Sequence, residues 1–221
     1  AAVLLFDTPT SVGTFVVLLL VQVFSALASG GAVVTGQYLG RREMEKASRS
    51  GQQLLLFMGE CAIVVTVLLY LMKSFILHVV FGKIAPDVAA YANTYFIITE
   101  ASTFFLALYS GGAALFRAMG NSGISMRVSC VMNLVNVVGN AILIFGLHCG
   151  VEGVAIPTLV SRIVAAALML FLLHRPSFAL HLERPFQFRH EKRMIRNIVL
   201  VGVPNGIENG MFQLGKIMLL S

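Results

Sequence analysis

Polar side chains recur at helical spacing near the end of the chain, inside the apolar stretch IVLVGVPNGIENGMFQLGKIMLLS (198–221). At 100° per residue they share an arc of about 140°, and a polar stripe on a membrane helix faces protein or a cavity, not lipid. Glu208 is two turns from Lys216, too far for an i, i+4 ion pair. Glu208 is therefore predicted to bind an entering cation or proton, and a purely structural glutamate is the alternative. The stripe consists of Asn205, Glu208, Asn209, Phe212, Gln213 and Lys216.

A second group of polar residues is the amide series in NLVNVVGN, where Asn133, Asn136 and Asn140 stand at i, i+3 and i+7. On a helix they fall within about 60° of arc. Such a stripe either joins two membrane helices by hydrogen bonds or lines a wet cavity, and the spacing favours neither.

Two further acids stand inside apolar stretches, where an ionisable group costs about 2.5–3.5 kcal/mol. Glu100 shares a helix face with Asn93 and Thr103 and is a candidate ion-coupling residue. Glu60 has few polar neighbours and is interpreted as structural. Arg162 also lies near the middle of an apolar stretch and needs a partner, for which Glu60 and Glu100 are both candidates.

The elements that carry these residues are predicted to be membrane-spanning helices. Of 221 residues, 57% are hydrophobic and 12% are charged, whereas a soluble domain has about 25% charged residues. Six stretches are long and apolar enough to span a bilayer as helices. The predicted fold class is all-α, a polytopic transmembrane helical bundle. The stretches are 8–40, 50–72, 88–116, 128–151, 153–174 and 197–221.

The net charge of +6 is distributed as in a membrane protein, not as in a nucleic-acid-binding protein. The loops 41–49, 117–127 and 175–196 hold twelve Lys and Arg, and the alternate loops 73–87 and 148–152 hold two. The asymmetry predicts that the first three loops are cytoplasmic. The three cysteines fit no zinc or disulfide spacing, so no metal or organic cofactor is expected.

Four segments together resemble one family, the multidrug and toxic compound extrusion (MATE) transporters, in their order and spacing. They are GGAVVTGQYLGRREMEKA (30–47), AALFRAMGNSGIS (113–125), GVEGVAIPTLVSR (150–162) and VGVPNGIENGMF (201–212).

The resemblance implies a twelve-helix fold with two six-helix lobes, of which this chain is a half-plus fragment. Residues 1–174 would be helices two to six of the N-terminal lobe, and 175–196 the cytoplasmic loop between the lobes. Residues 197–221 would be the first helix of the C-terminal lobe, truncated.

The resemblance also implies an activity, namely a secondary antiporter that exports organic, often cationic compounds in exchange for sodium or protons. Asn136 and Asn140 match a family Asn and Asp that help to bind the coupling cation, so an amide replaces the acid here. Thr158 matches a threonine near that site. Some members carry an essential Glu about one turn beyond Glu208. Ion-coupling candidates are therefore Glu208, Glu100, Asn136, Asn140 and Thr158, and substrate-cavity candidates are Asn205, Asn209, Phe212, Gln213 and Asn133.

Two other functions are considered. A flippase or exporter for lipid-linked or other amphiphilic precursors is the alternative. A flippase cavity usually needs a cluster of basic residues to bind phosphates. Only Arg162 and Lys216 lie within the predicted spans, which disfavours this function. An enzyme is not expected, since the chain has neither HExxH nor Gly-x-Ser-x-Gly. The expected setting is a multi-pass protein of the plasma membrane, monomeric at full length, whose partners are lipid and a small organic substrate.

Overall fold

The computed structural model describes the backbone of residues 9–81, 86–146, 152–176, 178, 180, 182 and 191–219. Side chains are described at 21–71, 97–146, 153–176, 178, 180, 182, 191–208 and 211. Throughout this described part the secondary structure is helical, and it contains no strand. The elements are α2 (Pro9–Gly40), α3 (Met44–Phe81), α4 (Pro86–Ala118), α5 (Ser122–Ala141) with its π-helical continuation η1 (Ile142–Gly146), α6 (Glu152–Leu173) and α7 (Lys192–Leu219).

The predicted fold class is confirmed, because the chain forms a bundle of long apolar helices. Within the described residues, three helical segments are long and apolar enough to cross a membrane: Met44–Leu71, Ser122–Gly146 and Gly153–Leu173. The other three predicted spans coincide with α2, α4 and α7, each of which extends past the residues whose side chains are described.

Short connections make successive helices antiparallel neighbours. After α2 the chain turns at Arg42, whose φ is 60°, and after α4 it turns at Gly120, whose φ is 75°. The Glu43 N–H donates to the carbonyl of Tyr38 at 3.0 Å in the first of these turns. α2 begins at Pro9, and proline is common at the first position of a helix.

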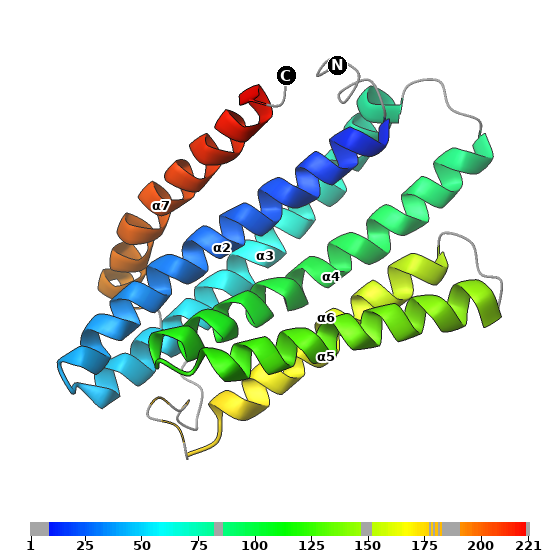
Figure 1. Cartoon of the computed structure of the whole chain (residues 1–221). Helices are drawn as coiled ribbons and strands as arrows, with labels where there is room; N and C mark the ends of the chain where they lie inside the picture. Colours follow the sequence, from blue (N-terminus) through cyan, green and yellow to red (C-terminus); the bar gives the residue numbers. More distant parts are fainter. Residues whose placement is uncertain are drawn as a thin grey trace.

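The helices pack around a core that involves α2, α3, α4 and α6. In Figure 1, α2, α3 and α4 run side by side, with α5 and α6 on one flank and α7 on the other. The largest buried side chains of this core come from all four helices and include Phe24, Leu54, Met58, Phe116, Met169 and Leu173.

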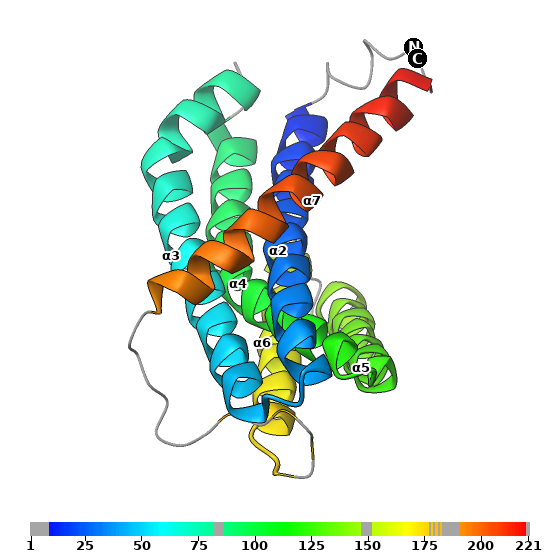
Figure 2. The ribbon, with the colours of Figure 1, turned by 90° about the vertical axis from the view of Figure 1, so that its left-hand side faces the viewer.

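α7 crosses α2 at a point where the two backbones nearly touch. A Cβ on Gly30 would lie 2.5 Å from the carbonyl oxygen of Ile198 and 2.6 Å from the amide nitrogen of Gly202. Figure 2 shows α7 running diagonally over α2 and α3. Glycine at both positions is what permits this approach.

The segment predicted as a linker, 175–196, differs from expectation in two ways. First, α7 begins at Lys192, not at 197, so Arg193 and Arg196 also lie on the helix. Second, part of the segment packs into the bundle: Leu180 and Leu182 are buried.

Two further contacts attach this segment to the helices. The Phe178 ring meets Phe116 edge-on, with centroids 5.3 Å apart. The Leu182 N–H donates to the carbonyl of Leu173 at 2.8 Å. The sequence did not predict this packing, because the segment was interpreted as a loop from its many basic residues, and the apolar Phe178, Leu180 and Leu182 stand between those charges.

Candidate functional site

The amide series on α5 meets α6 through a chain of hydrogen bonds. Asn140 Nδ2 donates to Asn136 Oδ1 at 3.2 Å, and Asn136 Nδ2 donates to Thr158 Oγ1 at 3.2 Å. Thr158 Oγ1 in turn donates to the Val154 carbonyl at 2.9 Å. The structure therefore brings together three predicted ion-coupling residues, Asn136, Asn140 and Thr158, which we call the amide cluster.

The backbone around the amide cluster is shaped for close contact. A Cβ on Gly139 would lie 2.8 Å from Pro157 Cβ, so this glycine lets α5 approach α6 beside the cluster. Immediately after the cluster, the helix continues as the π-helical turn η1, a form that is frequent at functional sites. Asn133, the predicted third amide, is exposed and takes no part in these hydrogen bonds.

The chemistry of the amide cluster is that of neutral oxygen ligands. Asn136 Oδ1 and Thr158 Oγ1 each accept a hydrogen bond within the cluster. Asn140 Oδ1 is buried and has no hydrogen-bond partner in the described part of the chain. A hard cation prefers such oxygens, and Asn140 Oδ1 accepts no hydrogen bond within the described part of the chain.

Glu100 lies on α4, in a second polar cluster. Its side chain is 2% exposed, and Thr103 on the same face is also buried. Arg162 of α6 donates to Ser102 Oγ and interacts electrostatically with Glu100. Two acids were considered as partners of Arg162. The Glu100 carboxylate is one that interacts with it electrostatically. The Glu60 side chain is exposed.

Sequence reasoning missed two members of this second cluster. Ser102 Oγ accepts from Arg162 and donates to the Thr99 carbonyl at 2.6 Å. The Thr99 side chain is itself buried. The available signal was a run of hydroxyl residues around Glu100 in an otherwise apolar helix.

The predicted polar stripe of α7 is only partly described. Asn205 is half-buried and Glu208 is exposed. Asn209, Phe212, Gln213 and Lys216, together with Asn93 of α4, lie outside the residues whose side chains are described. Ile198 and Gly202, which face α2 at the helix crossing, fall on the same side of an ideal helix as this stripe.

An open groove of about 870 Å³ follows the first half of α7. Its walls are apolar except at one end, and neither Asn205 nor Glu208 is among the described residues that line it. Of the predicted substrate-cavity residues, Asn205 and Asn133, whose side chains are described, are not among the residues that line this groove. The lining residues are Lys192, Ile195, Arg196, Val199, Leu200, Val203 and Pro204.

Comparison with known proteins agrees with the resemblance seen in the four segments. The profile of the MatE family matches residues 10–142, more than half of the chain. The chain belongs to the MatE family of membrane transporters.

Individual relatives support the same assignment. The chain is 23% identical over 207 residues to the uncharacterized transporter YisQ of Bacillus subtilis (strain 168), covering 91% of this chain and 44% of YisQ. It is 27% identical over 208 residues to the probable multidrug resistance protein NorM of Thermotoga maritima, covering 90% and 43%. The chain thus spans less than half the length of these relatives.

The fold matches solved structures as well. A crystal structure of MATE in the bent conformation superposes with a TM-score of 0.82 at 20% identity, covering 99% of this chain and 47% of that one. A MATE family transporter of the MOP superfamily in its outward-facing conformation gives a TM-score of 0.81 at 18% identity, covering 90% and 44%.

Proposed function

We propose that this chain forms part of a secondary antiporter that exports organic, often cationic compounds in exchange for sodium ions or protons. The observation that carries the proposal is the amide cluster, in which two helices of a MatE-family bundle bring half-buried amide and hydroxyl groups together. The name of one relative, a probable multidrug resistance protein, agrees with such a role. Transport would proceed by rocking of two lobes about a central cavity.

The proposed setting is the plasma membrane, with the full-length protein as a monomer. Glu208 on α7 is the first candidate for the acid that couples ion entry to export. Its exposure in this structure leaves its carboxylate open to an entering ion.

Export of ethidium from proteoliposomes that contain the natural, full-length protein tests this function. We expect efflux driven by an inward sodium gradient, an inward proton gradient, or both, and no efflux without a gradient. Glu208→Gln should abolish gradient-driven efflux while the protein still inserts. Glu60 is an exposed acid on α3. Glu60→Gln is therefore the matched control and should transport like the parent.

Failure of the parent to export ethidium under either gradient would count against the proposed antiporter. Movement of a fluorescent lipid analogue between leaflets in the same vesicles would instead support the flippase alternative. Equal export by Glu208→Gln and the parent would remove Glu208 from the coupling role and leave the antiporter intact.

A further inference from the structure

A carboxyl group is buried halfway along α4. Glu100 is 2% exposed, and its Oε2 has no hydrogen-bond partner within the described part of the chain. The neighbouring Thr99 Oγ1 is also buried without a partner there. Polar atoms in a bilayer interior normally pair, and intramembrane ionisable residues are rare for that reason. An acid with a free oxygen at this depth indicates a place where something binds.

Two helices face Glu100 with polar groups. On α6, Arg162 donates to Ser102 Oγ, two residues beyond Glu100 on α4, and it attracts the Glu100 carboxylate. On α3, Thr66 Oγ1 donates to the backbone carbonyl of Glu100 at 3.5 Å.

The other ionisable groups in the described part of the helices packed against α4 are mostly exposed. α3 contributes Glu45, Lys46 and Arg49 near its start and Glu60 and Tyr70 further along, all exposed, together with the half-buried thiol of Cys61. The described part of α2 has no charged residue, and Tyr38 lies near its last turn. Arg127 of α5 is exposed near the start of that helix. Within the described residues, Arg162 is the cation whose charge acts on the Glu100 carboxylate.

We propose that Glu100, with Arg162 as its counter-charge, is a proton-binding site separate from the amide cluster. The ligand is a proton and not a metal ion for an electrostatic reason. The positive charge of Arg162, which acts on the carboxylate, repels an entering Na⁺, whereas a proton joins one carboxylate oxygen and needs no further ligands. This inference deepens the proposed antiporter, because it names one of the ions that would drive it.

The position of Arg162 connects this site to the amide cluster. Thr158, which accepts the hydrogen bond from Asn136, precedes Arg162 by one turn of α6. Ser161 Oγ also donates to the Thr158 carbonyl at 2.9 Å. Protonation of Glu100 removes the negative charge that attracts Arg162 toward α4, and any resulting shift of α6 acts on Thr158. Proton binding on α4 is thereby linked to the state of the α5–α6 contact.

Infrared difference spectroscopy of the full-length protein in lipid tests the site without relying on transport. The spectrum between mildly acidic and mildly alkaline buffer should contain the carbonyl band of a buried protonated carboxylic acid. Glu100→Gln should remove the band. Because removal of one partner of a buried pair is destabilising, the double variant Glu100→Gln/Arg162→Gln, which removes both charges, provides a second test of the same loss. Glu60→Gln is the control and should keep the band.

Persistence of the band in the double variant overturns the proposal, as does its absence from the parent or its loss in Glu60→Gln. In proteoliposomes, the double variant should also lose ethidium export driven by a proton gradient while still binding ethidium. If the parent exports no ethidium at all, the antiporter fails but the infrared band still decides the proton site. If the parent exports and the double variant retains proton-driven export, only the proton site fails.

Discussion

At the scale of single residues, the amide cluster is the best-defined feature of the described chain. Spacing alone placed Asn136 and Asn140 on one helix face, and the family resemblance pointed to Thr158. The hydrogen bonds from Asn140 to Asn136 and from Asn136 to Thr158 establish that they meet. Spacing could not exclude Asn133, because an arc of about 60° does not say which residues of one face meet a partner on the neighbouring helix. Its side chain is exposed.

Thr158→Val should weaken the α5–α6 contact, because valine has the shape of threonine but offers Asn136 no acceptor. Interhelical hydrogen bonds in membranes are worth on the order of 1 kcal/mol, so we expect a modest fall in the midpoint of thermal unfolding. Thr158→Ser, which restores the hydroxyl, should regain most of the parent stability, and Asn133→Ala should change nothing. A valine variant as stable as the parent would mean that this hydrogen bond does not hold the helices together.

At the scale of elements, the helices were predictable and their contacts were not. The apolar stretches located each described helix but not its ends. α3 and α5 each begin six residues before the predicted stretch, and α3 ends nine residues after it. α7 starts five residues earlier than predicted because Lys192, Arg193 and Arg196 were assigned to a basic loop. Charge governs which side of the membrane a segment lies on, but straight-chain Lys and Arg are good helix formers. The Glu191 N–H also donates to the buried Gln53 of α3 at 3.0 Å, which fixes the chain just before α7.

The crossing of α2 and α7 offers a test of helix packing with a control on the same helix. Gly30→Ala places a Cβ within 2.5–2.6 Å of the α7 backbone at Ile198 and Gly202. The helices must then separate, at a cost of about 1–3 kcal/mol. A Cβ on Gly36 would meet nothing within 4 Å. Gly36→Ala should therefore leave the free energy of unfolding unchanged or slightly raised. Thermal unfolding of both variants in detergent measures the difference, and equal midpoints would refute the close crossing.

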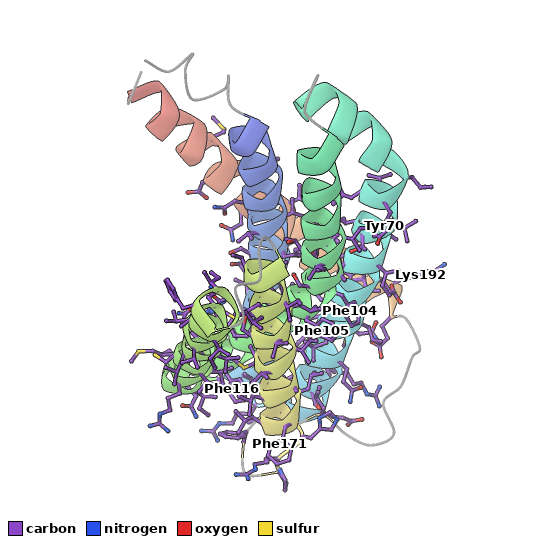
Figure 3. The ribbon with its side chains drawn as sticks, turned by 90° about the vertical axis from the view of Figure 1, so that its right-hand side faces the viewer. Tyr70, Phe104, Phe105, Phe116, Phe171 and Lys192 are labelled. Carbon is purple, nitrogen blue, oxygen red and sulfur yellow. The ribbon has the colours of Figure 1, made fainter. Side chains whose placement is uncertain are left out.

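At the scale of the whole molecule, three basic segments gather at one end of the bundle. The turns after α2 and α4 and the segment after α6 lie together there, as Figure 1 shows. Two contacts tie them: Phe178 packs on Phe116, and Arg49 lies 3.9 Å from the carboxylate of Glu191. Figure 3 shows Phe116 and Phe171 toward that end, with Phe104 and Phe105 further along the bundle. The counts of Lys and Arg predicted that these segments lie on one side of the membrane. The described contacts bring them together at one end of the bundle.

Labelling of single cysteines can determine whether that end is cytoplasmic. In a variant without Cys61, Cys130 and Cys149, an impermeant thiol reagent added outside intact cells should spare Lys46→Cys and Ser122→Cys, and it should modify them after permeabilisation. Both positions are exposed, whereas a cysteine at the buried Ser48 would stay unlabelled on either side. Gly146→Cys, exposed at the opposite end of α5, should be labelled from outside. The reverse pattern would invert the topology.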